Sequence, residues 1–252
     1  MIEPHARRIL DEYEAIKADI RRYEQGLTGT LTLAIEPNAV MTLPTGVLGA
    51  YRSVRPGISL NLVTSSGVSA LESLTSGEVD GVVSIPMCDD SFEYASVLRE
   101  PLCIVIHAEQ LGATQANSPD HTTSQSALNQ LNGKVLCGVA REHPIEAQIC
   151  GYLARHGVFV TMCYDYPSAM LALEAARAGL GGCIMTAAAA SSFTAESGLV
   201  VVRLDAPDAE GSDPAGPPQW EVGVTYRRDS SKAPMIADLV TYLRGASHAG
   251  GA

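Results

Sequence analysis

Long apolar runs and aromatic side chains are both scarce in this 252-residue sequence, in which Phe, Trp and Tyr make up 5% of the residues. The longest apolar runs are well short of the roughly 20 residues that a membrane-spanning helix needs. The first residues, MIEPHARRILDEYE, also lack the apolar segment of a secretory signal. With 46% hydrophobic and 18% charged residues, the composition is typical of a globular, cytoplasmic protein without a membrane partner.

Positive charge is equally sparse. The chain has 17 Lys and Arg against 28 Asp and Glu, so its formal net charge is −11, and no basic cluster is longer than a pair. A surface of that sign repels phosphate backbones. We therefore expect no broad electrostatic contact between this chain itself and nucleic acid.

The sequence carries none of the short motifs that mark nucleotide sites or common hydrolases. GxGxxG, GxxxxGK[ST], GxSxG and HExxH are all missing. Cys137, His143 and Cys150 are close in the sequence, but no signature of a cysteine hydrolase surrounds them. We therefore predict no enzyme activity, no catalytic residue and no cofactor.

The six cysteines are scattered singly, with neither a CxxC pair nor the spacing of a zinc site. Without a secretion signal, the simplest interpretation is that they are reduced thiols that fill the core. A redox-sensing pair is the alternative, but nothing marks one cysteine as both exposed and activated. The residues are Cys88, Cys103, Cys137, Cys150, Cys163 and Cys183.

A strand–helix–strand–helix–strand pattern fills residues 29–84. Short apolar runs at 30–35, 58–63 and 79–85 are typical of buried strands. Between them, apolar side chains recur at helical spacing in 43–54 and 68–74. Because this alternation requires parallel strands with right-handed crossovers, it predicts half of a doubly wound α/β sheet.

Small uncharged hydrogen-bonding side chains follow the predicted strands: Asn38, Thr64, Ser65 and Ser66. In doubly wound sheets, ligands lie beyond the carboxyl ends of the strands, next to helix N-termini. The free N–H groups of a helix N-terminus favour anions. The set therefore predicts a site for a small polar ligand, although Ser and Asn are also common helix caps and each could serve only as a cap.

A long amphipathic helix over residues 2–24 precedes this unit. Its apolar residues step alternately by four and three, which is the a/d pattern of a coiled coil. So narrow a stripe favours a partner helix, most simply from a second copy; a helix that lies on its own domain is the alternative. The predicted interface residues are Ile2, Ala6, Ile9, Tyr13, Ile16 and Ile20, and Tyr23 completes the stripe.

The second half of the chain repeats the layout with a different sequence, which predicts a second α/β lobe. Strands at 95–98 and 102–106 flank Pro101, near which the chain is expected to cross between lobes. A strand at 220–226 and a helix at 232–243 return to the first lobe. The predicted domains are 1–26 as a linker helix, 27–106 with 205–246 as lobe I, and 107–204 as lobe II. A small-molecule site is expected in the cleft between the lobes.

Five short stretches, in order over nearly the whole chain, resemble the LysR-type transcriptional regulators. They are ARRIL at 6–10, GLTGTLTLAIEP at 26–37, YRSVRPGISLNL at 51–62, LTSGEVDGVV at 74–83 and AGLGGCIMT at 178–186. The resemblance covers that family's linker helix and effector-binding domain. It implies a periplasmic-binding-protein-like α/β fold of type 2, with two Rossmann-like lobes and a small effector in the cleft.

The winged helix-turn-helix of that family precedes the linker helix, and this sequence begins at the linker helix. We therefore expect the DNA-binding domain to be missing, either through truncation, which the coiled-coil pattern already present at Met1 favours, or through an internal start. The rest is an effector-sensing and self-association module that forms a dimer or a tetramer. The resemblance implies promoter DNA as a partner only through the missing domain, and RNA polymerase as a candidate partner. A stand-alone solute-binding protein of the same fold is the alternative, but it would carry a signal peptide or lipid anchor and few free thiols.

The segment VLCGVAREHPI, at 135–145, resembles the LILPSRxHGLR stretch in one branch of the family. That resemblance would put Arg141 and His143 at a helix N-terminus facing the cleft, with Pro144 at the first helical position. Arginine offers a planar fork of donors that matches a carboxylate, and histidine can add a donor near neutral pH. The effector is therefore predicted to be a small organic anion, in the first instance a carboxylate.

Arg141 also has an alternative role as half of a surface ion pair with Glu142 or Glu146, since such pairs are common on solvated faces. Thr186, which stands where the family usually has a proline, completes the effector-binding set that the resemblance implies.

Overall fold

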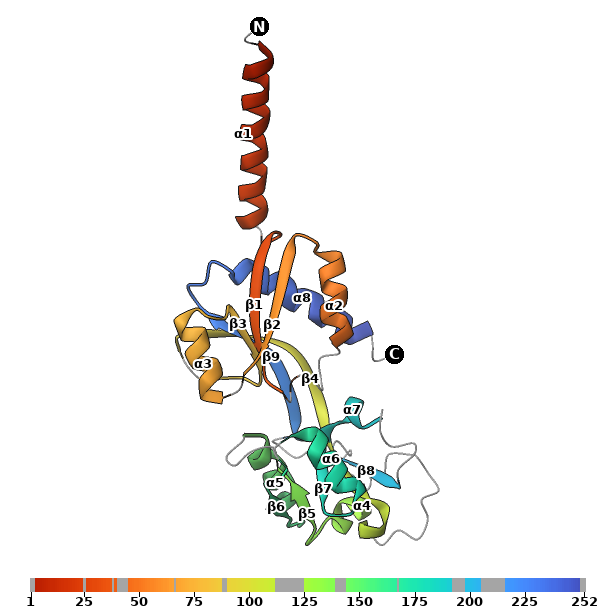
Figure 1. Cartoon of the computed structure of the whole chain (residues 1–252). Coiled ribbons are helices and arrows are strands. Elements are labelled where there is room, and N and C mark those ends of the chain that lie inside the picture. The colour runs from red at the N-terminus through yellow and green to blue at the C-terminus, as the bar shows by residue number, and fades with distance from the viewer. Residues whose placement is uncertain are drawn as a thin grey trace. The chain divides into compact units, whose positions relative to one another are not determined.

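Two compact units make up the chain, and two strands run from one unit into the other. The structure is a computed structural model, and it describes residues 3–24, 26–37, 39, 45–65, 67–87, 90–111, 125–138, 144–166, 168–191, 198–204 and 216–249 (Figure 1). Unit 1 comprises Met1–Leu98 and Glu221–Ala252, and unit 2 comprises Arg99–Trp220. The connecting strands are β4 (Phe92–His107) and β9 (Gln219–Arg227), so both boundaries fall within strands.

The sheet of unit 1 has the strand order β2-β1-β3-β9-β4. Its parallel strands are β1 (Gly29–Ile35), β2 (Ile58–Thr64) and β3 (Gly81–Ser84), and β9 runs antiparallel to β3. The βαβαβ pattern predicted from the sequence is therefore present, with β2 at the edge of the sheet. Because β1, β2 and β3 are parallel, their carboxyl ends lie at one edge of the unit.

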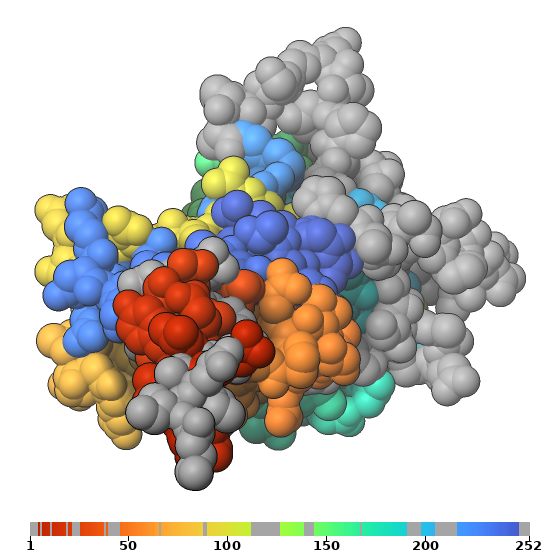
Figure 2. Space-filling model, turned by 90° about the horizontal axis from the view of Figure 1, so that it is seen from above, coloured from red at the N-terminus to blue at the C-terminus, as the bar shows by residue number. Residues whose placement is uncertain are grey.

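Besides the N-terminal helix, the described part of unit 1 has the helices α2 (Thr45–Val54), α3 (Gly67–Ser76) and α8 (Ala233–Ala249). The helices α2 and α8 pack against each other, and the space-filling view shows their side chains in orange and blue next to one another (Figure 2). The rings of Tyr51 and Tyr242 meet across this contact with centroids 5.3 Å apart. The helix α8 therefore belongs to unit 1.

The linker helix α1 (Glu3–Glu24) is one continuous helix, and it precedes β1 in the chain (Figure 1). Four of its predicted interface residues are largely exposed: Ile9 at 69%, Tyr13 at 57%, Ile16 at 53% and Ile20 at 52%. These four side chains are therefore accessible to a partner helix, and their role in self-association stays a prediction.

The sheet of unit 2 has the order β4-β7-β5-β6, with β8 on the other side of β4. The parallel strands are β5 (Val135–Cys137), β6 (Thr161–Cys163) and β7 (Gly182–Thr186), whereas β8 (Leu199–Arg203) is antiparallel to β4. The helical segments are η2 (Ala108–Leu111), α4 (Gln125–Gln130), α5 (Pro144–Arg155), α6 (Ala169–Arg177) and α7 (Ala187–Ser191). The second half of the chain therefore repeats the α/β layout of the first.

Two helix starts in unit 2 follow directly from the sequence. Pro144 is the first residue of α5, where its missing N–H leaves no helical hydrogen bond unmade. Ser168 caps α6, and its hydroxyl accepts the N–H of Leu171.

The prediction of two short strands on either side of Pro101 is wrong, because β4 passes through this residue without a break. Proline has no N–H to donate to a neighbouring strand, so a strand tolerates it where no sheet hydrogen bond from that nitrogen is needed. The pairings of β4 with β7 and β8 begin at Leu102 and Cys103, just beyond the proline.

Three cysteines that are far apart in the sequence stand side by side in unit 2. Cys137 of β5 is the register partner of Cys163 on β6 and of Cys183 on β7. Register partners on parallel strands project from the same face of a sheet, so the three thiols form one row. Cys137 and Cys183 are buried, and Cys163 is half-buried.

Candidate effector site

The predicted site residues fall into two groups. Asn38, Ser66, Arg141 and His143 lie outside the described residues, as does Ile2 of the predicted dimer interface. The structure describes Thr64 and Ser65 in unit 1 and Thr186 in unit 2. The surroundings of these three residues are therefore described separately, first in unit 1 and then in unit 2.

In unit 1, Thr64 and Ser65 lie at the carboxyl end of β2. Thr64 is the last residue of β2 and is exposed, and the half-buried Ser65 donates its backbone N–H to the carbonyl of Ile35 at 3.3 Å. The helix α3 begins two residues later, at Gly67, whose φ of 56° suits glycine. Both residues therefore lie between the end of β2 and the start of α3, and their role towards an effector stays a prediction.

Glu36 is a polar group at this edge that the sequence reasoning did not select. It follows β1, its backbone N–H donates to Val83 at 3.0 Å, and its carboxyl group accepts the N–H of Ile85. Burial raises the pKa of the Glu36 carboxyl, and the Ile85 N–H partly opposes that shift. Its Oε2 is buried without a hydrogen-bond partner among the described residues. An acidic residue directly after a predicted strand was the available signal.

In unit 2, the hydroxyl of Thr186 has partners within the chain. Thr186 is only 5% exposed, and its oxygen accepts the N–H of Ala189 at 3.3 Å at the start of α7. Burial raises the pKa of the nearby Glu100 carboxyl group, and a hydrogen bond between that group and Thr186 partly opposes this shift. Thr186 thus joins the end of β7 to β4, and its role towards an effector stays a prediction.

Glu146 is a second polar group that the sequence reasoning did not place at the site. It lies in the first turn of α5, is 6% exposed, and accepts the Tyr164 hydroxyl through Oε2 at 2.8 Å. Its Oε1 packs over Gly138, where an added Cβ would lie 2.3 Å away, so a larger residue there would force the Glu146 carboxyl group to shift. That oxygen has no hydrogen-bond partner within the described part of the chain. The alternative ion pair of Arg141 was with Glu142 or Glu146 on a solvated face; the structure buries Glu146, and Glu142 lies outside the described residues.

The edge of unit 1 offers hydroxyls and a carboxyl group beside a helix N-terminus, which favours anions. Within the described ranges, no group of three His, Cys, Asp or Glu side chains could hold a metal ion. None of the described helices is both long and apolar enough to cross a membrane.

The family model for the LysR substrate binding domain matches residues 24–247. The chain belongs to this family. Its predicted fold, two α/β lobes of the periplasmic-binding-protein type after a linker helix, is confirmed by the family match and by solved structures of LysR-type regulators.

Two curated proteins are similar in sequence, and both are HTH-type transcriptional regulators. IlvR of Caulobacter vibrioides is 24% identical over 241 residues, which cover 94% of this chain and 74% of IlvR. CitR of Bacillus subtilis is 25% identical over 103 residues, which cover 40% of this chain. This match spans 35% of CitR.

Solved structures share the fold at lower identity. The reduced regulatory domain of OxyR2 from Vibrio vulnificus has a TM-score of 0.65 at 19% identity, over 87% of this chain and 96% of that one. An H2O2-bound variant of OxyR from Corynebacterium glutamicum has a TM-score of 0.71 at 19% identity, over 98% and 74%. CbnR, a LysR family transcriptional regulator, has a TM-score of 0.67 at 17% identity, over 96% and 78%.

Proposed function

We propose that this chain is the effector-sensing and self-association module of a bacterial LysR-type transcriptional regulator. It binds a small organic anion and relays that binding to a winged helix-turn-helix domain that contacts promoter DNA. Membership of the LysR substrate binding domain family supports the sensing role. Cytoplasmic location, DNA contact through the other domain and contact with RNA polymerase are parts of the same proposal.

One observation carries the ligand assignment: polar side chains gather at the carboxyl ends of the unit 1 strands, where such folds bind ligands. Thr64 and Ser65 stand beside the N-terminus of α3, and Glu36 lies at the end of β1. A raised pKa favours the neutral form of the Glu36 carboxyl, and a neutral carboxyl donates its O–H to an anion. Glu36 is therefore compatible with a bound carboxylate when it is protonated.

The sequence resemblance adds Arg141 and His143 to this proposed site. They precede α5, whose first residue is Pro144. A guanidinium group there would bind a carboxylate through two parallel hydrogen bonds. In a chain with a net charge of −11, a cationic pair at a strand end would provide a local anion site.

Calorimetric titration of the wild type with a panel of small carboxylates tests this function. Replacing Arg141 by Ala should weaken binding of the carboxylate that the wild type selects by about 2 kcal/mol, or about thirtyfold, because a charged hydrogen-bond partner is lost. Arg52→Ala is the matched control, since Arg52 is an exposed residue in the last turn of α2. If Arg141→Ala binds that carboxylate as tightly as the wild type does, the anion-site assignment is wrong.

Self-association through α1 is a further part of the proposal. The described members of its apolar stripe are more than half exposed, while its other faces carry charged side chains. A second copy of the same helix is the simplest partner, because an a/d stripe is self-complementary in a coiled coil. The second copy would remove these apolar side chains from water.

Peroxide sensing is a second candidate function, which the row of Cys163, Cys137 and Cys183 favours together with the likeness to an H2O2-bound OxyR. The protonation of the thiols argues against it. Burial raises the pKa of Cys137 to about 11 and that of Cys183 to about 12, so both thiols are protonated near neutral pH. Because the thiolate is the reactive form, these two residues are poor sensors.

A further inference from the structure

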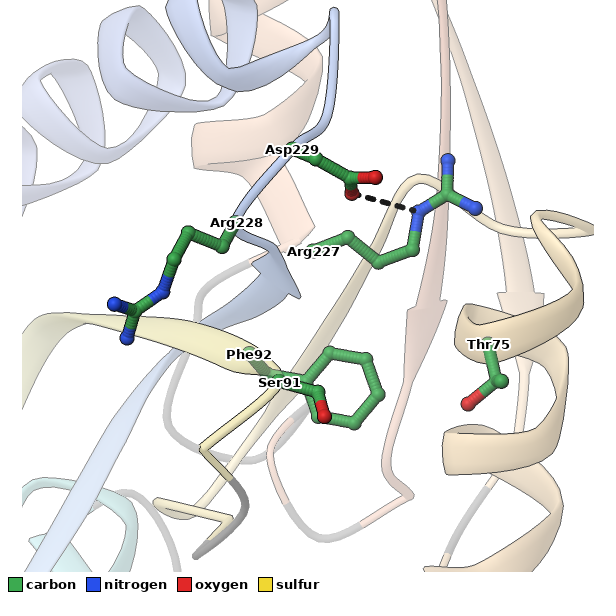
Figure 3. A pocket seen from close by; sticks show the side chains of 6 residues that line it. All are labelled: Thr75, Ser91, Phe92, Arg227, Arg228 and Asp229. Carbon is green, nitrogen blue, oxygen red and sulfur yellow. Dashed lines mark ion pairs between the residues drawn. The ribbon is translucent and has the colours of Figure 1, made fainter.

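A pocket of about 600 Å³ lies in unit 1, away from the strand ends discussed above. Three elements line it: Thr75 near the end of α3, Ser91 and Phe92 at the start of β4, and residues 227–229 at the end of β9 (Figure 3). Its volume is within the range of small-molecule sites and exceeds that of a single inorganic ion. The lining combines one aromatic ring with two arginines.

The register of the sheet separates this pocket from the candidate effector site. The strands β3 and β9 are antiparallel, with Gly81 opposite Tyr226 and Ser84 opposite Gly223. Arg227, which follows Tyr226, therefore lies at the amino-terminal end of β3. Glu36 and Thr64 lie at the opposite, carboxyl-terminal edge of the same sheet.

Arg227 provides a cation that has no close ionic partner in the described part of the chain. Its Nε is 3.9 Å from Oδ1 of Asp229, which is longer than a hydrogen bond. The side chain of Arg227 is 42% exposed and that of Asp229 is 90% exposed, so water weakens this pair. By contrast, Arg55 of the same unit bonds Asp238 through two nitrogens, at 2.8 and 2.9 Å. Arg227 can therefore take an anionic ligand without breaking a strong pair.

The neighbouring arginine differs from Arg227 in direction and exposure. Its Nε is also 3.9 Å from a carboxylate oxygen, Oε1 of Glu93, so its ion pair is no closer than that of Arg227. Figure 3, however, shows the guanidinium of Arg227 on the side of Thr75 and that of Arg228 on the opposite side. The side chain of Arg228 is also 67% exposed, against 42% for Arg227. We therefore take Arg227 as the ligand-binding cation and Arg228 as an internal control.

Phe92 gives the pocket an apolar wall. The half-buried ring packs against a core cluster made of Ala34, Ala70, Leu74, Val79 and Val82. Because this contact fixes one side of the ring, the side that lines the pocket can receive a flat apolar group at a low cost in entropy. The hydroxyl of Thr75 donates to the carbonyl of Leu71 at 2.8 Å, which also holds that side chain in place.

We propose that this pocket is a second ligand site of unit 1, for a small carboxylate that carries a flat apolar ring. The carboxylate binds the guanidinium fork of Arg227, and the ring packs on Phe92. This site is separate from the proposed effector site, and its existence does not depend on that proposal.

Calorimetry of the full chain with benzoate as the probe tests the site. We expect benzoate to bind the wild type, and Arg227→Ala to weaken it by about tenfold or more. Arg228→Ala should leave the affinity unchanged. Acetate and benzyl alcohol should both bind more weakly than benzoate, since the first lacks the ring and the second lacks the charge.

Three results would overturn the proposal: no benzoate binding, equal affinity of the wild type and Arg227→Ala, or equal losses in the two arginine variants. Glu36→Gln separates the two sites, because it should not change benzoate affinity; a loss there with Arg227→Ala unaffected would place benzoate at the strand ends instead. If Arg227→Ala does not fold, Arg227→Lys replaces it. That variant keeps the charge and loses the fork, so wild-type affinity in it would also contradict the assignment.

Discussion

The hydroxyl of Tyr164 donates a 2.8 Å hydrogen bond to Oε2 of Glu146, while the other oxygen of that carboxyl group is buried over Gly138. This pair joins the end of β6 to the first turn of α5, next to the segment that carries Arg141 and His143. A buried polar group that loses its partner costs free energy because water cannot replace the lost bond. The pair is therefore expected to hold the start of α5 in place.

Replacing Tyr164 by Phe should lower the free energy of unfolding by about 1 to 3 kcal/mol, since the Glu146 carboxyl group then loses its hydroxyl donor. Urea denaturation followed by circular dichroism measures this change. Tyr166→Phe is the matched control, as it removes a hydroxyl two residues away, from a side chain that is also half-buried. An equal loss of unfolding free energy in the two variants would show that the Tyr164–Glu146 hydrogen bond does not stabilise the fold.

A second bond network predicts a pH dependence of stability. Asp238 of α8 accepts hydrogen bonds from Arg55, at 2.8 and 2.9 Å, and from Tyr51 of α2, at 3.0 Å. The hydrogen bonds from Arg55 lower the pKa of Asp238 below its usual value, against the effect of burial. A carboxyl whose pKa is lower in the folded state contributes stability above its unfolded pKa and loses it as the pH falls through the folded pKa.

We therefore expect Asp238→Asn to have a lower Tm than the wild type at pH 7, and the difference to shrink as the pH falls below about 4. Thermal unfolding over a series of pH values measures both quantities. Asp229→Asn, at an exposed site, should match the wild type throughout. A difference between Asp238→Asn and the wild type that stays constant down to acid pH would contradict the role of this network.

The apolar stripe of α1 predicts the effect of charge on self-association. Ile9→Asp together with Ile16→Asp places two carboxylates in the proposed seam, so light scattering should report a lower molecular mass. Arg7→Asp together with Arg21→Asp introduces the same two side chains at exposed positions outside the stripe and should have no such effect. If the domains also pair edge to edge, as the family resemblance implies, the mass should fall only part of the way. An unchanged mass would exclude the stripe as an interface.

The cysteine row predicts chemical inertness in spite of its geometry. Mild peroxide should leave Cys137 and Cys183 as free thiols, because burial raises the pKa of both and little thiolate is present near pH 7. Thiol counting by mass spectrometry after alkylation in denaturant measures this, with a sample oxidised while unfolded as the positive control. A reversible disulfide between Cys137 and Cys163 that changes assembly or carboxylate binding would show that the row is a redox switch.

The sequence predicted elements that depend on local pattern and could not predict those that depend on register. Pro144 and Ser168 stand where their chemistry requires, at the start of a helix. The row of Cys163, Cys137 and Cys183 arises only when three strands pair, and no spacing in the chain reveals it. Pro101 suggested a break in what is one continuous strand, because the local sequence does not show how that strand pairs with its neighbours.

The candidate site was predictable in its location and less so in its side chains. Parallel strands fix the edge, so Thr64 and Ser65 were found from alternation alone. Glu36 and Glu146 were missed because a charged residue after a strand is usually solvated, and only the packing shows that each has one buried oxygen without a partner among the described residues. Burial is a property of the assembled unit, not of the neighbouring sequence.

The central claim, that an anion binds beside Glu36, is tested most directly by the pH dependence of carboxylate affinity. The measurement is calorimetric titration of the wild type and Glu36→Gln with the tightest-binding carboxylate of the panel, over a pH range in which that ligand stays ionised. We expect wild-type affinity to fall as the pH rises through the raised pKa of Glu36, since the neutral carboxyl donates to the ligand and the ionised form repels it. Glu36→Gln keeps a donor at all pH values, so its affinity should stay constant. An affinity that rises with pH in the wild type, or the same pH profile in both proteins, would contradict an anion site at this edge.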